Sequence, residues 1–231
     1  MPRLEPPECL RRRFELAHTE LVVAGRRYEL LRPRSVNELI CEEDFALDGR
    51  IPYWADCWPS SRVLAERIAR ERGRGRRLLE LGCGIGLVSL VAAQAGFDVL
   101  ATDYYAAALE FTAANAQRHD LHGVDTRLVD WRSLPDDLET FDVVAASDVL
   151  YEAPQAALVA AALASTLAPQ GLGLLSDPGR RTAEAFVERC ASLGLTARCA
   201  HSLPSADVGA GLAVSIFEIR RACIAGQRTP I

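Results

Sequence analysis

The sequence predicts a single α/β domain built on a doubly wound sheet that is mostly parallel. Between residues 77 and 193, apolar runs of strand length alternate with longer segments of helical periodicity, and such alternation requires right-handed crossovers and a parallel sheet. The last two strand-like runs, 195–201 and 212–220, have no helix between them, so they predict an antiparallel pair. A chain of 231 residues is long enough for one such domain with an ordinary core.

The elements can be placed in order along the chain. Residues 1–52 are expected to form an N-terminal extension or lid, in which apolar residues on both sides of Ala24–Gly25 predict a β-hairpin. Residues 53–231 are expected to form the main domain, whose first helix begins at Pro59 and reaches about residue 72, because proline suits a first helical turn. Strands are expected at 77–81, 98–102, 126–129, 141–147 and 171–176, and helices at 86–95, 105–119, 155–168 and 180–193.

Composition narrows the class of protein. A hydrophobic content of 49% with 25% charged residues is typical of a globular domain, and a net charge of −5 argues against non-specific nucleic-acid binding. No run approaches the roughly 20 apolar residues of a membrane helix. The seven cysteines form no C-x-x-C pair, which predicts reduced thiols. The four histidines lack the spacing of metal ligands, so we expect no metal site. We expect a cytoplasmic monomer with no membrane or nucleic-acid partner.

The most informative segment is Leu78–Gly86, LLELGCGIG, which predicts a buried strand followed by a glycine-rich turn. Glycines lacking Cβ atoms let the backbone turn tightly and approach a ligand closely. A dinucleotide fingerprint would need a glycine where Leu87 stands, and no Lys-Ser or Lys-Thr follows, which excludes a P-loop. Asp103, 17 residues beyond Gly86, ends the next strand, where a carboxylate can accept both ribose hydroxyls. The pattern resembles the S-adenosylmethionine site of class I methyltransferases.

The other strand tips also carry polar or aromatic residues, and ligands bind at the carboxyl ends of strands in open α/β sheets. Asp103 has an alternative role as the cap of the following helix. Trp131 can stack on an adenine ring while Asp130 contacts its amino group, or Trp131 can be an aromatic of a satellite core. Asn115 is expected to be a helix-surface or capping residue, and Cys83 a small residue that fills the turn.

Three further segments make the resemblance more specific. They are 51–61 (IPYWADCWPSS), Asp148-Val149-Leu150-Tyr151 after the fourth strand, and Asp177-Pro178-Gly179-Arg180 after the fifth. Together they resemble the seven-strand protein-lysine methyltransferases with a D-x-x-Y motif, and most closely the branch that methylates the electron transfer flavoprotein β-subunit. That resemblance implies a Rossmann-like seven-strand sheet. Ser176 and the pair Ser60-Ser61 depart from the branch, where glycines are usual.

The resemblance also implies roles for individual residues. Asp148 would orient the acceptor amine, and Tyr151, Tyr53 and Trp54 would form an aromatic wall that accepts a cation. Asp177 and Arg180 would contact the substrate. The cofactor contacts are expected to be Trp58, Glu80, Gly82, Cys83, Gly84, Gly86, Asp103, Asp130, Trp131 and Ser147.

Each of these roles has a structural alternative. Tyr151 can pack on the sheet, Trp54 and Trp58 can form one hydrophobic staple of the helix that begins at Pro59, and Asp177 has an ordinary turn signature.

The leading hypothesis is therefore an S-adenosylmethionine-dependent N-methyltransferase acting on lysine side chains of a protein, with the electron transfer flavoprotein β-subunit as the first candidate. The alternatives are a methyltransferase for a small, nicotinamide-like amine and a non-catalytic cofactor-binding module, because a fold does not fix a function. A nicotinamide-dependent oxidoreductase is a third class. Leu87 argues against it, because the dinucleotide fingerprint needs a glycine at that position.

Overall fold

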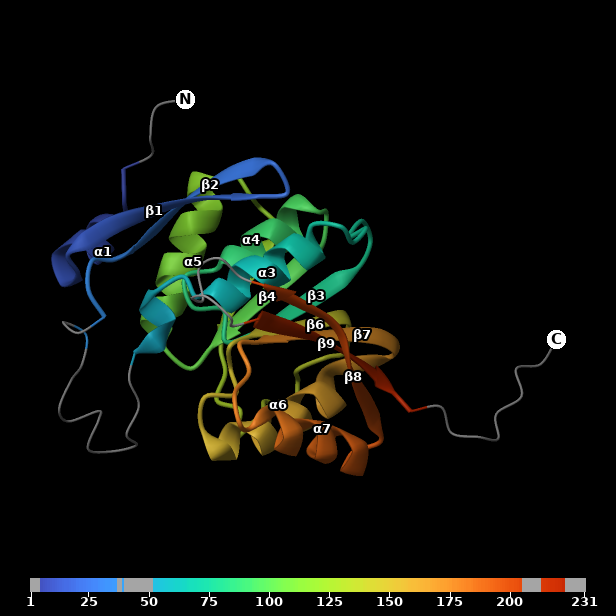
Figure 1. Ribbon diagram of the computed structural model, residues 1–231. Coiled ribbons are helices and arrows are strands. Elements are labelled where there is room, and N and C mark those ends of the chain that lie inside the picture. The colour runs from blue at the N-terminus through green and yellow to red at the C-terminus, as the bar shows by residue number, and fades with distance from the viewer. Residues whose placement is uncertain (1–4, 37–38, 40–51, 205–212, 223–231) are drawn as a thin grey trace.

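The computed structural model describes residues 5–36, 39, 52–204 and 213–222, and it shows a three-layer α/β arrangement (Figure 1). A seven-strand sheet has the order β5-β4-β3-β6-β7-β9-β8, in which β9 runs in the opposite direction to the other six strands and so pairs antiparallel with both β7 and β8. The predicted fold class, a doubly wound sheet with an antiparallel end and an N-terminal hairpin, is confirmed. The strands are β3 (Arg77–Leu81), β4 (Asp98–Asp103), β5 (Val124–Leu128), β6 (Phe141–Ser147), β7 (Leu167–Asp177), β8 (Leu195–Pro204) and β9 (Ala213–Arg221).

Helices cover both faces of the sheet. One face carries α3 (Pro59–Ile68), α4 (Leu87–Gln94) and α5 (Ala106–Arg118), and the other carries α6 (Ala153–Thr166) and α7 (Ala183–Ser192) (Figure 1). The side chains of successive strand residues point to opposite faces, so Leu78 joins the core under α3–α5 while Leu79 joins the core under α6 and α7. The sheet therefore lies between two hydrophobic cores, one on each of its faces.

The boundaries differ from the predicted ones at a few places. β7 begins at Leu167 rather than at residue 171, because Leu167 already pairs with Phe141 before a register irregularity. α3 ends at Ile68 rather than near residue 72. Two short elements were not predicted, α1 (Glu8–Arg13) and the 3-10 turn η2 (Tyr53–Ala55).

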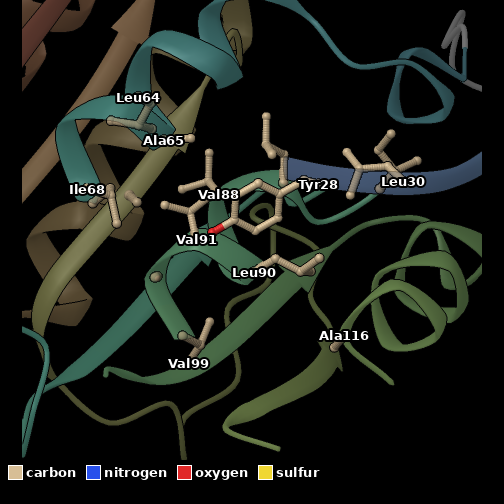
Figure 2. Close-up of a cluster of buried hydrophobic side chains, with 14 of the residues drawn as sticks. Tyr28, Leu30, Leu64, Ala65, Ile68, Val88, Leu90, Val91, Val99 and Ala116 are labelled. Carbon is tan, nitrogen blue, oxygen red and sulfur yellow. The ribbon is translucent and has the colours of Figure 1, made fainter. Parts of the chain in front are cut away.

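The N-terminal hairpin consists of β1 (Leu16–Val23) and β2 (Arg26–Pro33). Ala24 and Gly25 join them with φ values of 48° and 77°, the left-handed pair that a two-residue hairpin turn requires. Figure 2 shows Tyr28 of β2 inserted between side chains of α4, among them Val88 and Val91. The hairpin is thus packed into the core on this face of the sheet. The domain boundary expected at residues 52 and 53 stays a prediction.

Asn115 on α5 links the hairpin to the glycine-rich turn. Its side chain is fully buried; Oδ1 accepts the N–H of Leu31 at 2.7 Å, and Nδ2 donates to the carbonyls of Leu31 and Ile85 at 2.9 Å each. The prediction of a helix-surface or capping role was wrong, because a buried amide must find such partners to offset its lost hydration.

Candidate active site

The topology opens a cleft at the carboxyl ends of the central strands. The chain runs outward from β3 through β4 to β5 and then returns to β6 on the other side of β3, which makes a switch point between β3 and β6. A cleft with about 990 Å³ of empty space, its open mouth included, lies there. Most of the predicted site residues line it: Tyr53, Trp54, Trp58, Glu80, Gly82, Cys83, Gly84, Asp103, Asp130, Trp131, Ser147, Asp148 and Tyr151.

The glycine-rich turn has left-handed backbone angles that favour glycine. Gly82, Gly84 and Gly86 have φ values of 74°, 55° and 90°. A Cβ atom at Gly84 would lie 2.9 Å from the carbonyl oxygen of Trp54, so this turn fits closely against η2. Gly86 lies outside the cleft lining, and a Cβ there would meet the Thr112 side chain at 2.8 Å. Gly86 therefore makes room for α5, and its predicted role as a cofactor contact stays a prediction.

Asp103 holds the turn in place from the tip of β4. Its Oδ2 accepts the N–H of Gly84 at 2.9 Å and its Oδ1 accepts the N–H of Tyr105 at 3.0 Å. The side chain is buried, and burial raises the pKa of the carboxyl. The ribose role is compatible with this geometry, because an ionised carboxylate has about four acceptor positions and the backbone N–H groups occupy only part of them. The alternative role as a helix cap is wrong, since α5 begins after Tyr105 and has no side-chain cap hydrogen bond.

Glu80 is a second buried carboxyl, on β3 beneath the turn. It accepts a hydrogen bond from the Ser89 hydroxyl of α4. Burial raises the pKa of Glu80 from 4.5 to about 8. The folded protein thus keeps a proton on Glu80 at pH 7, whereas the unfolded chain loses it near pH 4.5. The resulting stabilisation is complete below pH 4.5 and is lost as the pH rises through about 8.

A Glu80→Gln variant should remove this titration and keep an acceptor for Ser89. We expect its melting temperature to fall less between pH 6 and pH 9 than that of the wild type, and to exceed it at pH 9 by at least about 2 °C. Calorimetry across this pH range measures the difference, with Glu188→Gln on the exposed side of α7 as the control. Parallel curves for Glu80→Gln and the wild type would contradict the assignment.

Trp131 and Asp130 follow β5 at the cleft wall. The Trp131 ring lies against Gly82, since a Cβ there would be 3.4 Å from its Cζ2. The ring is half-buried and also packs on the core under α6 and α7. This packing agrees with the alternative prediction that Trp131 is a core aromatic. Its Nε1 is buried and has no hydrogen-bond partner within the described part of the chain. The Asp130 carboxylate is held by Arg132, with the shortest distance 2.6 Å, while still lining the cleft.

Three aromatic rings stand at the other end of the cleft. The Tyr53 ring lies edge-on to the rings of Tyr151 and Trp58, with centroid distances of 5.2 and 5.8 Å. The Trp58 Nε1 donates to the Tyr53 carbonyl at 2.8 Å, which fixes the indole. Tyr53, Trp58 and Tyr151 form what we call the aromatic wall.

Trp54 does not belong to the aromatic wall. Its ring is packed in the core against Phe14, Tyr105 and Phe111, with centroid distances of 6.4, 6.3 and 5.7 Å, and the residue is 9% exposed. Its predicted role in binding a cation is corrected to a supporting one. The alternative of a Trp54–Trp58 staple is also wrong, since the two rings contact different neighbours.

Asp148 adjoins the aromatic wall in an uncommon backbone conformation, with φ of 53°. Its N–H donates to the Ser176 carbonyl at 2.9 Å. Its Oδ1 accepts hydrogen bonds from Nε and Nη2 of Arg180, at 3.0 and 2.8 Å. Arg180 was predicted to contact the substrate; it lies outside the cleft lining, because its guanidinium is turned onto Asp148.

Asp177 shapes the turn that presents Arg180. It is 1% exposed, and its Oδ1 accepts the N–H groups of Gly179 and Arg180 at 2.8 and 2.7 Å. Burial raises the pKa of this carboxyl. Asp177 was predicted to contact the substrate; its burial favours the turn role instead. The unusual Ser176 and Ser60 meet here, since the Ser176 hydroxyl donates to the Ser60 carbonyl at 2.9 Å and ties β7 to α3.

Sequence reasoning missed several residues that line the cleft. Tyr104 and Tyr105 directly follow the tip of β4, so the strand-tip rule could have found them. Asp56 directly follows η2 and Gln155 lies on α6, so neither is at the end of a strand and the strand-tip rule does not find them.

The charges of the cleft have one sign. Its lining contains the carboxylates of Asp56, Asp103, Asp130 and Asp148 besides the protonated Glu80, and among the described residues it contains no Arg, Lys or His. Within the same part of the chain, no group of three or more His, Cys, Asp or Glu residues could hold a metal ion, and no helix is long and apolar enough to cross a membrane. A site of this kind suits a cationic ligand and repels a phosphate.

A family profile described as "Methyltransferase domain" matches residues 60–205, well over half of the chain. The chain belongs to the methyltransferase-domain family. This membership confirms the predicted methyl donor, S-adenosylmethionine. The site fits that group: the glycine-rich turn borders the cleft beside Asp103, a carboxylate can accept more hydrogen bonds than its backbone partners supply, and the acidic lining tolerates the positive charge of the group.

Relatives of this methyltransferase agree with the resemblance seen in its motifs. It is 31% identical over 100 residues to "Protein N-lysine methyltransferase METTL21A" of Xenopus tropicalis, covering 41% of this chain and 46% of the relative. It is 29% identical over 136 residues to "Electron transfer flavoprotein beta subunit lysine methyltransferase" of Xenopus laevis, covering 56% and 53%. The methyltransferase thus spans about half the length of the curated relatives it matches.

Solved structures share the fold of this methyltransferase. The ribosomal protein L11 methylase of Lactobacillus delbrueckii subsp. bulgaricus superposes with a TM-score of 0.58 at 16% identity, covering 71% of this chain and 79% of the methylase. A TehB-like SAM-dependent methyltransferase of Corynebacterium glutamicum superposes with a TM-score of 0.53 at 19% identity, covering 80% and 96%. At these identities the likeness concerns the fold alone.

Proposed function

We propose that this methyltransferase acts on an amine nitrogen, and that its acceptor is a lysine side chain of a protein. The observation that carries the proposal is the acidic cleft, lined by four carboxylates and by the aromatic wall, with Asp148 in the same lining. Carboxylates and aromatic faces attract ammonium groups. A hydroxyl or carbon acceptor carries no positive charge and would need neither the carboxylates nor the aromatic rings.

Methyl transfer to an amine needs the neutral amine as nucleophile. S-adenosylmethionine, when bound, supplies a methyl group on a positively charged sulfur. The N–C bond forms while the C–S bond breaks, the electron pair leaves with the sulfur, and the new ammonium releases its proton to water. A lysine amine has a pKa of about 10.4, so roughly one in a thousand is neutral near pH 7.4. The site must therefore lower this pKa and align the amine.

The residues of this chain can do both. The aromatic wall strips water from the acceptor, which favours the neutral amine, as does the positive charge of the donor. The Asp148 carboxylate can accept a hydrogen bond from the amine through Oδ2, since Arg180 binds only Oδ1. Holding the nitrogen at attack distance from the methyl group is where most of the acceleration arises.

The electron transfer flavoprotein β-subunit is the first substrate to test. The motifs at 51–61, Asp148–Tyr151 and Asp177–Arg180 support it, as does the name of a relative that is 29% identical. Other relatives are named for other acceptors: "Histone-arginine methyltransferase METTL23" of Xenopus laevis is 28% identical over 137 residues. A small amine is the second candidate, because the same cleft would attract it.

Transfer of a tritiated methyl group tests the proposal directly. The purified chain is incubated with labelled S-adenosylmethionine and with host-cell lysate, purified electron transfer flavoprotein, or a panel of small amines. We expect a labelled protein whose modified residue is lysine by mass spectrometry. The chain contains no lysine, so label on the enzyme itself cannot mimic that result. Label confined to small amines would favour the second candidate, and transfer only to oxygen or carbon would contradict the proposal.

A further inference from the structure

The contact between Asp148 and Arg180 poses a physical problem for an amine methyltransferase. The carboxylate that the acceptor amine should meet is already bound by a guanidinium, through two hydrogen bonds to Oδ1. The Asp148 side chain is 6% exposed and that of Arg180 is 38% exposed, so the pair lies at the border of the cleft. An ion pair between two residues without a functional role would need no explanation. This one does, because Asp148 is the residue that we propose to bind the acceptor amine.

The pair is built into the fold by the two loops that follow β6 and β7. Asp177 accepts the N–H of Arg180 at 2.7 Å and so fixes where the side chain begins. The Asp148 N–H is bound to β7 through the Ser176 carbonyl, and the Thr182 hydroxyl donates to the Leu150 carbonyl. These two hydrogen bonds join the segment that follows β6 to β7 and to the start of α7, near the ion pair.

An isolated Asp148 charge would work against catalysis. A carboxylate next to an amine favours the ammonium form and raises the amine's pKa, whereas transfer needs the neutral form. A guanidinium on the same carboxylate offsets much of this field. Its charge would lie within about 6 Å of an amine at Oδ2, which at an effective dielectric constant of 20 to 40 corresponds to about one to two pH units.

We propose that Arg180 is a positioning residue that neutralises Asp148, so that the carboxylate aligns the acceptor amine without retaining its proton. The inference rests on the proposed amine acceptor. Arg180 does not touch the amine; it acts through Asp148. The role also explains why the arginine is bound to a carboxylate that lines the same cleft as Tyr53 and Tyr151.

Other titratable groups border the same place. Asp177 lies at the tip of β7, where burial raises its pKa; Tyr53 and Cys57 come from the segment around η2, and Tyr151 from the loop before α6. Burial also raises the pKa of the Cys57 thiol. These groups are the same in the wild type and in Arg180 variants, so a difference between pH profiles reports the removed charge.

The test is kcat at saturating acceptor amine and S-adenosylmethionine, which reports pKa values in the bound complex, from pH 6 to pH 10 in the wild type, Arg180→Gln and Arg180→Lys. We expect the profile of Arg180→Gln to shift to higher pH by about one unit, so that a roughly tenfold loss at pH 7 largely disappears near pH 9.5. Arg180→Lys should keep most of the wild-type profile because it keeps the charge. Arg181→Gln, an exposed neighbour with the same change of charge, should show no shift.

Two results would overturn the proposal while the proposed function stands. One is an equal loss for Arg180→Gln at every pH, which is what a merely structural role predicts; the other is a Lys variant as impaired as Gln with no shift. Affinity for S-adenosylhomocysteine and the melting temperature, measured on the same variants, reveal a collapsed site. If the wild type methylates no amine at any pH, the proposed function fails, and the role of Arg180 fails with it.

Discussion

Replacing Asp148 with asparagine is expected to lower turnover by about 100-fold or more, because a displaced nucleophile loses roughly that factor. The variant keeps the shape of the side chain but loses the charge that aligns the amine and anchors Arg180. Binding of S-adenosylhomocysteine should change by less than about threefold, since most of the expected cofactor residues lie at the ends of β3, β4 and β5. Single-turnover methyl transfer and calorimetric titration measure the two quantities on the same preparation.

The choice of asparagine matters because Asp148 has φ of 53°. Asparagine and aspartate tolerate this left-handed conformation, whereas alanine pays about 1 kcal/mol or more for it. An alanine variant would therefore mix a lost carboxylate with a strained loop. Asp125→Asn on the exposed part of β5 is a matched control and should leave turnover unchanged. Turnover of Asp148→Asn within threefold of the wild type would remove Asp148 from the acceptor site.

The sheet could be predicted where strands are bounded by clear breaks. β3 and β6 were placed to the residue, since each is an apolar run between charged or glycine-rich segments. The first residues of β7, Leu167 to Gly171, carry a proline and a glycine and resemble a loop. They are strand because Leu167 pairs with Phe141, a contact across 26 residues that local patterns do not contain.

The location of the cleft was predictable for a related reason. The strand-tip rule needs only the ends of strands, and those were known to within a residue or two for β3, β4 and β6. What the rule does not contain is the direction in which a side chain turns. Arg180 turns inward to Asp148, 32 positions earlier, and the Trp54 ring enters the core instead of the aromatic wall.

Asn115 illustrates the same limit for buried polar groups. Its partner Leu31 is 84 positions away, and helical periodicity gives no sign that a hairpin will cover that position. Once the hairpin is in place, the amide satisfies both backbone groups of Leu31 and the carbonyl of Ile85 in the glycine-rich turn. One side chain thereby hydrogen-bonds both to the N-terminal hairpin and to the glycine-rich turn that borders the cleft.

Replacing Asp103 with alanine is expected to weaken binding of S-adenosylhomocysteine by more than about tenfold, because a buried acceptor of charge-assisted hydrogen bonds is worth at least about 1.4 kcal/mol. The loss has two sources in this structure. The carboxylate would no longer accept the ribose hydroxyls, and the N–H groups of Gly84 and Tyr105 would lose their partner. Titration calorimetry with the variant measures the sum.

A second ligand separates the two sources. If Asp103 binds ribose, an S-adenosylhomocysteine analogue lacking the ribose hydroxyls should bind the wild type at least about tenfold more weakly, yet bind Asp103→Ala almost as well as the parent ligand does. The coupling between the two changes is then the ribose contact itself. If both proteins lose the same factor with the analogue, the changes are additive, and Asp103 serves only to hold the glycine-rich turn. Asp130→Asn provides the contrast, because its carboxylate lines the cleft but is bound to Arg132, and it should show no coupling to the ribose hydroxyls.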